Sequence, residues 1–493
     1  MSRDRQLLGA VCVLLAAEAV TFTVLLTDGP RHILWLEVVG SVIFLAAVLL
    51  LIRVRLPARQ LAALIIGTGA AFQIIAMTAP PQASDDDYRY VWDAKVQLAG
   101  IDPYRYTPVA PQLDQLRDGF LFPDRSDCAW PIPDGCSAIN RPTVHTIYPP
   151  VAEAAFAAVR VASFGGNGNH FPLQLAAALG SLVVAWLLYR RRLARDRPLW
   201  TVALWAWCPL TVLEFGNGAH IDWLAILLSV LALQSQAARR PRLAGVLIGA
   251  AIATKVYPVL ILPSLIRRHP RAVIGAALAT IVACYIPHVV AVGTKVLGFL
   301  PGYLRAEHYA SGRRFLLLDP VLPRVMATTA ATLLLVAAAW WVVRHAEPAR
   351  PEDSAVVMVG LALLITTPPY GWYAGLLLAL IAMSGAVEWL PVALVAGIAY
   401  LVDGAFTVSP AVDQLMYAGA LFATLVVASV RWASRQGDGG GVGRPGGVGP
   451  GHGYPVARAV ALDRARQALG GLHGRPADRG DDVSGGQAGP RRG

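Results

Sequence analysis

Long apolar runs recur along this chain, and they constrain its fold more than any other feature of the sequence. A helix that crosses the hydrocarbon core of a bilayer, about 30 Å thick, needs roughly 20 consecutive apolar residues. Many runs approach that length, and 56% of the residues are hydrophobic while 15% are charged, compared with about 25% charged residues in soluble domains. The sequence therefore predicts an all-α polytopic membrane protein.

Twelve runs are predicted to be transmembrane helices. They cover residues 7–27, 33–52, 60–79, 171–189, 198–213, 221–236, 272–292, 323–343, 354–367, 372–386, 389–404 and 411–431. The first run is too long for the apolar part of a secretory signal, and no small-residue cleavage site follows it. We therefore interpret it as an uncleaved first span.

Arginine clusters predict which loops face the cytoplasm, because cytoplasmic loops carry an excess of Lys and Arg. The basic loops are 53–59, 190–197, 239–242, 267–271, 344–350 and 431–435. Placing all of them inside requires two further assignments. Residues 147–165 become an amphipathic helix at the external interface, and residues 243–266 become a re-entrant pair of short helices. Both termini are then cytoplasmic, and residues 80–146 form a long first external loop.

The composition changes near Gly437, after which Gly, Pro, Arg and Ala dominate. Such a segment does not bury enough apolar surface to fold. We therefore predict two parts: an integral-membrane domain over residues 1–435 and a disordered cytoplasmic tail over residues 436–493.

The net charge of +11 would suggest a nucleic-acid partner in a soluble protein. Here the Arg residues cluster in short loops and in the tail, where topology signals are found. We therefore expect no nucleic-acid binding, and we expect membrane lipid as the surrounding partner.

Three consecutive acids, Asp85, Asp86 and Asp87, follow the third predicted span. One interpretation is a solvated helix start, since acids in the first turn of a helix interact favourably with its dipole. The other is chemical: a carboxylate at the mouth of a partly apolar cavity can act as a general base. Tyr88 and Arg89 come next and belong to the same external loop.

A second polar cluster lies between the fifth and sixth predicted spans. Glu214, Asn217, His220 and Asp222 fall within nine residues. Ionisable residues at such a place favour a functional site, although a polar turn among lipid headgroups is the alternative. A single His is thin evidence for a metal site, so we expect none.

Further candidate residues lie in the re-entrant segment and in two external loops. Lys255 either snorkels to the interface or binds an anion such as phosphate. Arg305 and His308 either belong to a solvated loop or bind a lipid phosphate, because guanidinium matches phosphate geometry. Tyr370 and Trp372 are either interfacial aromatic residues or a surface on which a sugar ring stacks.

Cys128 and Cys136 share the long external loop. If that loop faces an oxidising compartment, the two residues are a plausible disulfide. A zinc site is less favoured because no CxxC or HxxxH spacing accompanies them.

Six segments in order resemble the bacterial GT-C glycosyltransferases, in particular glycosyltransferase family 87 and the related actinobacterial α-mannosyltransferases. The first is SDDDYRYVWDAKVQLAGIDPYRYTP, similar to the family pattern SxDxYRYxWDGxxxxxGxNPY. The others are NRPTVHTIYPP (140–150), WCPLTVLEFGNGAHID (207–222), GAAIATKVYP (249–258), GYLRAEHYASG (302–312) and PPYGWY (368–373). Taken in order, they are spread over most of the stretch from residue 80 to residue 375.

The resemblance implies a GT-C-like bundle and an inverting transferase that uses a polyprenyl-phosphate sugar at the external face. Its acceptor would be a glycolipid or glycan, and no cofactor is implied. The family's general base lies two residues before the Tyr of YRY, which corresponds to Asp86. The chain departs from the pattern at Asp87, where an apolar residue is usual, and at Ala94 and Asp102, which replace Gly and Asn.

Our hypothesis is therefore a multi-pass α-mannosyltransferase that extends a lipid-linked or cell-wall glycan. Asp86 is the expected base, with Asp85 and Asp87 as alternates. Expected contacts to the donor phosphate and sugar come from Arg89, His220, Lys255, Arg305 and His308. Expected contacts to the acceptor or sugar come from Tyr88, Glu214, Asn217, Asp222, Tyr370 and Trp372. The alternatives are a pentosyltransferase of the same fold and a flippase for a lipid-linked sugar.

Overall fold

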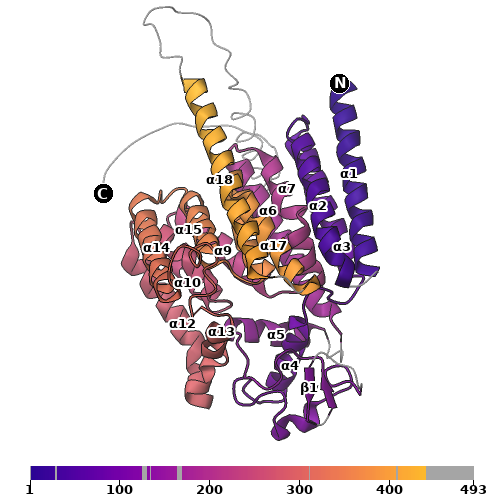
Figure 1. The fold of residues 1–493 in the computed structure, drawn as a ribbon, viewed down its shortest axis with the longest axis vertical. Coiled ribbons are helices and arrows are strands. Elements are labelled where there is room, and N and C mark those ends of the chain that lie inside the picture. Colours follow the sequence, from indigo (N-terminus) through magenta and orange to yellow (C-terminus); the bar gives the residue numbers. More distant parts are fainter. Residues whose placement is uncertain are drawn as a thin grey trace, which may run out of the picture. The chain divides into compact units, whose positions relative to one another are not determined.

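The computed structural model describes residues 2–27, 30–124, 130–133, 135–163, 169–309, 311–406 and 409–439. Helices dominate this part of the chain (Figure 1). Its one sheet is a short antiparallel hairpin of β1 (Trp130–Ile132) and β2 (Gly135–Ser137), in which Trp130 lies opposite Ser137. The predicted all-α class is confirmed for the described residues.

Eight helices of the described chain are long and apolar enough to cross a membrane. They lie in α1 (Ser2–Thr27), α2 (Pro30–Leu51), α3 (Ala58–Ala76), α6 (Phe171–Ala194), α12 (Pro270–Val292) with its extension to Ala306, α14 (Arg324–His345), α17 (Leu390–Ala405) and α18 (Pro410–Gly439). A ninth span results if the helical segments Leu199–Ala206 and Pro209–Asn217, bent by 51° relative to each other, are counted together.

The predicted number of twelve spans is not confirmed. Helix is present at every predicted span, but α9 (Asp222–Ala237), α15 (Pro351–Thr366) and α16 (Ala374–Ser384) have 16, 16 and 11 residues. A straight helix rises about 1.5 Å per residue, so none of them reaches the thickness of the hydrocarbon core.

The remaining helical segments are short. They are α4 (Asp86–Leu98), η1 (Pro111–Leu116), α5 (Pro150–Ala162), η2 (Leu199–Val202), α7 (Ala203–Ala206), α8 (Pro209–Thr211), η3 (Val212–Asn217), α10 (Pro241–Ile252), η4 (Tyr257–Ile261), α11 (Leu262–Leu265), η5 (Gly293–Leu297), α13 (Leu300–Ala306), η6 (Gly371–Tyr373) and η7 (Val387–Trp389). The predicted break near Lys255 lies between α10 and η4. The re-entrant path of this segment and the interfacial position of α5 stay predictions.

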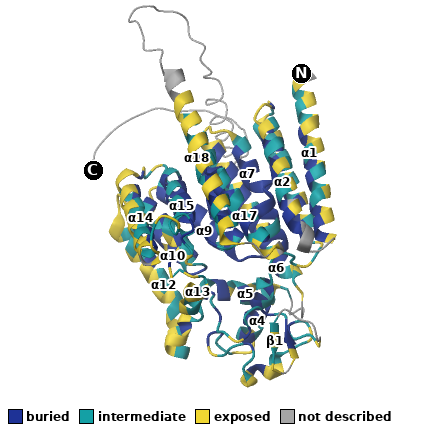
Figure 2. Ribbon diagram, viewed as in Figure 1, coloured by how far each residue is buried: buried dark blue, intermediate teal, exposed yellow. Residues whose placement is uncertain are grey.

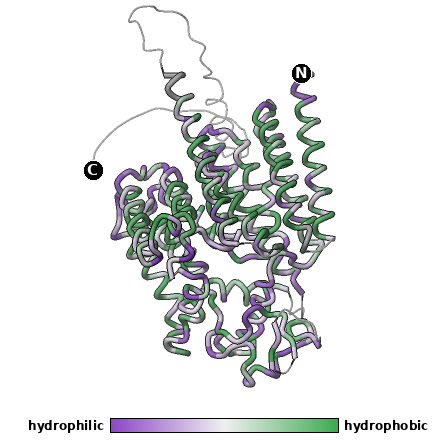
Figure 3. The backbone as a smooth tube through the Cα atoms, in the orientation of Figure 1, coloured by the Kyte–Doolittle hydropathy of each residue, from purple (hydrophilic) through white to green (hydrophobic). Residues whose placement is uncertain are grey.

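Side chains exposed on the outside of the long helices are largely apolar. Figure 2 shows exposed faces on α12, α14 and α18, and Figure 3 shows that these helices are mostly hydrophobic. Val282, Ile286, Leu333, Val336 and Phe422 are examples of exposed residues on them. Exposed apolar surface of this extent fits contact with lipid.

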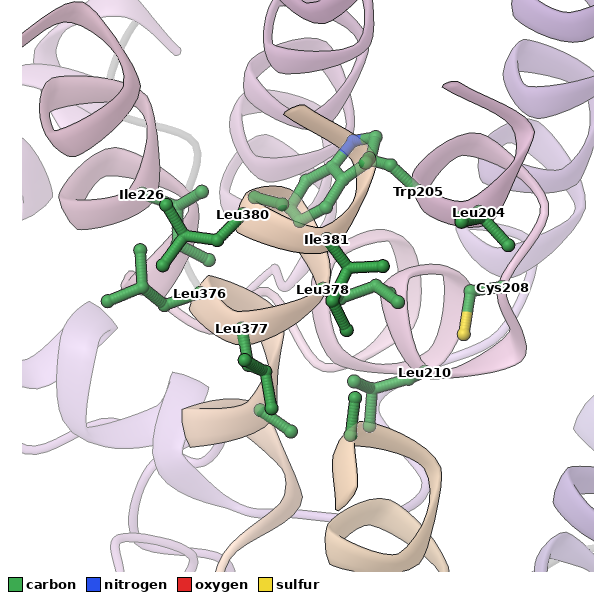
Figure 4. Packing of buried hydrophobic residues seen from close by; sticks show 14 of the residues in the cluster. Leu204, Trp205, Cys208, Leu210, Ile226, Leu376, Leu377, Leu378, Leu380 and Ile381 are labelled. Carbon is green, nitrogen blue, oxygen red and sulfur yellow. The ribbon is translucent and has the colours of Figure 1, made fainter. Parts of the chain in front are cut away.

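The helix α16 lies at the centre of the core. Every residue from Ala374 to Met383 is buried, and a helix that is apolar all round is expected to be enclosed. Figure 4 shows Leu376, Leu377 and Ile381 packing among side chains from Trp205, Leu210 and Ile226.

The chain between α3 and α6 forms a separate small lobe, which we define as the described residues of 80–163. It contains α4, η1, the hairpin and α5, and Figure 1 shows it at the ends of the long helices. It has its own buried cluster, which includes Tyr90, Trp92, Leu113 and Phe156. The long loop predicted from sequence is therefore a folded unit. The predicted tail lies outside the described residues from position 440 onward.

Candidate active site

A cavity of about 570 Å³ lies where the small lobe meets the helices. The small lobe supplies most of its polar wall, and the helices supply most of its apolar wall. The polar lining includes Asp85, Asp86, Arg89, Asn140, Arg141, His145 and Lys255. The apolar residues from η4, α13, α14 and α15 are Val259, Leu260, Leu300, Leu304, Leu335, Val359, Ala362 and Leu363.

Asp86 is the first residue of α4, and its carboxylate is held at the cavity wall by two donors. Asn140 Nδ2 donates to Asp86 Oδ1 at 2.5 Å, and the Tyr148 hydroxyl donates to Asp86 Oδ2 at 3.0 Å. The side chain is 14% exposed. A fixed, accessible carboxylate is the arrangement that a general base requires.

Asp85 also lines the cavity, but both of its oxygens are hydrogen-bonded. Trp130 Nε1 donates to Oδ2 at 2.6 Å, and Asn140 Nδ2 donates to Oδ1 at 3.0 Å. Burial raises the pKa of Asp85, while the bond from Trp130 lowers it in part. Asp85 thus helps to hold Asn140 in place, and Asn140 in turn holds Asp86.

Asp87 is fully buried and does not line the cavity. Its carboxylate pairs with His170. Burial raises the pKa of Asp87, and the bond to His170 lowers it in part. Of the three acids, Asp86 is therefore the best placed to meet a substrate in the cavity.

Lys255 reaches the cavity from the break between α10 and η4. Its Nζ lies 3.2 Å from Asp222 Oδ2, and its side chain is 12% exposed. The same Nζ lies 5.2 Å from the centre of the Tyr148 ring and 5.8 Å from the centre of the Trp372 ring. A cation enclosed by a carboxylate and two aromatic faces is held in position.

Residues 8–268 match the profile of a family described as "Alpha-(1->6)-mannopyranosyltransferase, N-terminal domain". The match spans more than half of the chain and includes Asp86, His220 and Lys255. The chain belongs to this family. No curated protein and no solved structure matches it in the comparisons made. The family confirms the expectation of a membrane glycosyltransferase of mannosyltransferase type.

His220 of this mannosyltransferase lies behind Asp86 and not on the cavity wall. It is fully buried, and its Nδ1 lies 2.9 Å from Glu214 Oε2. Its Nε2 lies 4.0 Å from Asp86 Oδ2. The imidazole stacks on Trp372, with ring centres 4.2 Å apart. The structure thus brings the sequence-predicted Glu214, His220 and Asp86 together, in a different arrangement from the expected contact with the donor phosphate.

Asn217 joins two segments of the backbone. Its Nδ2 donates to the carbonyl oxygens of Ala76 at 3.1 Å and Pro80 at 3.0 Å, and its Oδ1 accepts from the Gln82 N–H at 2.9 Å. The fully buried amide thereby fixes the end of α3 to the start of the small lobe. It does not line the cavity.

Some of the other residues predicted to contact substrate do not line the cavity, and one that does line it is already paired with an acid. Tyr88 packs against the rings of Phe120 and His170 and is not on the cavity wall. Arg89 lines the cavity but pairs with Asp93 at 3.1 Å. Arg305 and His308 are exposed and do not line the cavity.

The structure adds four functional candidates to those predicted from the sequence. Asn140 and Tyr148 contact Asp86 directly, and both lie in the segment NRPTVHTIYPP, so the motif was the available signal. Arg141 and Glu307 pair at 3.2 Å, and the Tyr370 hydroxyl donates to Glu307 Oε1 at 2.8 Å. No local sequence pattern joins residues that are 166 positions apart.

Only one of the two cysteines predicted to form a disulfide is among the described residues. Cys136 is disulfide-bonded, whereas Cys128 lies outside the described residues, so the pairing stays a prediction. Within the described ranges, no group of three or more His, Cys, Asp or Glu side chains is arranged to hold a metal ion.

Proposed function

We propose that this protein transfers a mannosyl residue from a polyprenyl-phosphate donor to a hydroxyl of a lipid-linked or cell-wall glycan at the external membrane face. The observation that carries the proposal is a single cavity that combines a fixed carboxylate, a held lysine and a wall of aliphatic side chains. The carboxylate suits a sugar hydroxyl, the lysine suits a phosphate, and the aliphatic side chains suit a lipid chain.

The donor's lipid would occupy the apolar wall formed by η4, α13, α14 and α15. Aliphatic residues such as Leu260, Leu304 and Leu363 line it, and a polyprenyl chain gains free energy from leaving water for such a surface. The donor phosphate would then lie near Lys255. Its ammonium offers three hydrogen-bond donors, although Asp222 already occupies one side of it.

Asp86 would act as the general base. Its carboxylate takes the proton from the acceptor hydroxyl while the acceptor oxygen bonds to the anomeric carbon. The bond between that carbon and the phosphate oxygen breaks, and polyprenyl phosphate leaves with the electron pair. Attack from the face opposite the phosphate inverts the anomeric configuration, so a family of α-mannosyltransferases implies a β-linked donor.

Charge that develops on the departing phosphate needs a positioned cation. Lys255 supplies one from the helices, and Arg141 supplies a second from the small lobe, since both line the cavity. The stacked rings of Tyr370 and Trp372, 4.5 Å apart, offer an apolar face for a sugar ring.

The test is product formation by the purified protein with β-mannosyl-phosphoryl-polyprenol and a mannosylated lipid acceptor. We expect a new mannosidic bond with α configuration, identified by mass spectrometry and NMR. If the protein transferred a pentose but not mannose, it would be a pentosyltransferase and the mannosyl assignment would be wrong. Movement of the donor across vesicle membranes without any new glycosidic bond would support a flippase and overturn the proposal.

A further inference from the structure

A buried histidine and a buried glutamate form a pair directly behind Asp86. His220 Nδ1 lies 2.9 Å from Glu214 Oε2 and 3.1 Å from the main-chain oxygen of Glu214. Both residues are buried, and neither lines the cavity. Burying two ionisable groups costs desolvation free energy that their attraction need not repay, so the pair calls for an explanation.

The contacts of His220 determine which ring nitrogen carries its proton. A carbonyl oxygen and a carboxylate only accept hydrogen bonds, so Nδ1 is the protonated nitrogen. Nε2 is therefore the nitrogen with a free lone pair in the neutral ring. It has no hydrogen-bond partner among the described residues, and it faces Asp86 Oδ2 at 4.0 Å.

The surrounding residues hold the ring in this orientation. Trp372 stacks on the imidazole face. Gly218 lies so close that a Cβ there would be 2.9 Å from His220 Nδ1. A side chain at position 218 would therefore push the imidazole away from Glu214.

We propose that His220, oriented by Glu214, is a proton relay that receives from Asp86 the proton taken from the acceptor hydroxyl. The inference rests on the proposed function and adds a step to it. When the acceptor oxygen bonds to the anomeric carbon, its proton moves to Asp86 Oδ2 and then to Nε2 of neutral His220. The resulting imidazolium is stabilised by the Glu214 carboxylate. After product release the imidazolium returns the proton to Asp86, which passes it to water in the cavity, and the neutral ring is restored.

The present separation of 4.0 Å is longer than a hydrogen bond, so Asp86 and His220 must approach by about 1 Å for the transfer. Catalytic contacts of this kind commonly tighten when substrate is bound. The alternative of a phosphate-binding cation requires His220 to reach the cavity, and it lies behind Asp86 and Trp372 instead.

The charged groups around His220 predict the pH dependence of the relay. Burial lowers the pKa of His220, but the carboxylates of Glu214, Asp86 and Asp222 outweigh burial and raise it above the ordinary value. Asp87 adds to this negative surrounding. The relay needs an unprotonated Nε2, so kcat falls as the pH drops through this raised pKa.

His220→Ala in the full-length protein tests the inference by chemical rescue. We expect kcat to fall roughly a hundredfold, while the KM for β-mannosyl-phosphoryl-polyprenol stays within about twofold of the wild-type value. Added imidazole is expected to restore kcat in proportion to its concentration, and more basic imidazoles are expected to restore more. In His220→Gln, the fall in kcat at low pH that is due to protonation of His220 should be absent.

His170→Ala is the matched control, because His170 forms the neighbouring pair with the buried Asp87. Imidazole should not change its rate. A wild-type kcat and pH profile in His220→Ala would overturn the relay, as would a folded, donor-binding variant that does not respond to imidazole. If the wild-type protein forms no mannosidic bond, the proposed function fails first, so the two failures are distinguishable.

Discussion

Three neighbouring aspartates have three different environments, and their hydrogen bonds explain why. Asp85 is occupied by Trp130 and Asn140, and Asp87 is buried against His170. Asp86 keeps an accessible face while two donors fix it. Successive residues of a helix point about 100° apart, so a single turn at the start of α4 is enough to separate their surroundings.

This difference predicts how amide substitutions affect catalysis. Asp86→Asn should lower kcat at least roughly a hundredfold, because Asn cannot accept the acceptor's proton. Asp87→Asn should stay within about tenfold of wild type, since Asp87 does not meet the cavity. Steady-state kinetics on detergent-purified protein check both, with size-exclusion profiles to confirm folding. Equal losses in the two variants would contradict the assignment of the base.

A second prediction at the level of single residues concerns Lys255 and the donor phosphate. Lys255→Met should raise the KM for the donor more than tenfold, because the cation proposed to meet the phosphate is removed. Lys295→Met is the control, since Lys295 is exposed and does not line the cavity. A rise in KM of similar size for both variants would remove Lys255 from the phosphate site.

At the scale of elements, α10 packs unusually close to α12, and two glycines permit it. A Cβ at Gly245 would lie 2.4 Å from the Val273 carbonyl oxygen, and one at Gly249 would lie 2.6 Å from that of Ala277. Small residues allow helix backbones to approach in this way in membranes. The contact fixes α10, whose end precedes Lys255.

Gly245→Ala is therefore expected to destabilise the protein by about 1–3 kcal/mol, because backbone must move to admit the methyl group. Gly275→Ala on α12 is the control: nothing lies within 4 Å of a Cβ there, and Ala favours helix over Gly by about 1 kcal/mol. Thermal denaturation in detergent measures both. Similar melting temperatures for the two variants would show that the contact is looser than described.

At the scale of the whole cavity, the small lobe and the helices contribute different halves of one site. The sequence predicted the acidic loop, the lysine and the aromatic turn from their motifs, and the structure brings Asp86, Lys255 and Trp372 to one cavity. It did not predict the Arg141–Glu307 pair, because that contact depends on tertiary packing. The predicted number of twelve spans is not confirmed, since apolar runs around α15 and α16 do not reveal where the helix ends.

The division of the cavity predicts a dependence on lipid length. Leu304→Trp narrows the apolar wall and should raise the KM for a long polyprenyl donor several-fold, while a donor with two or three isoprene units is affected less. Leu333→Trp is the control, because Leu333 is exposed on α14 away from the cavity. Equal effects on long and short donors would place the lipid elsewhere.

Tyr148 contacts both of the charged groups that the proposed reaction needs, Asp86 and Lys255. Its hydroxyl bonds Asp86 at 3.0 Å, and its ring face attracts the Lys255 ammonium at 5.2 Å. Tyr148 therefore holds the proposed base and the proposed phosphate-binding cation through one side chain, so a change at position 148 disturbs both ends of the proposed reaction at once.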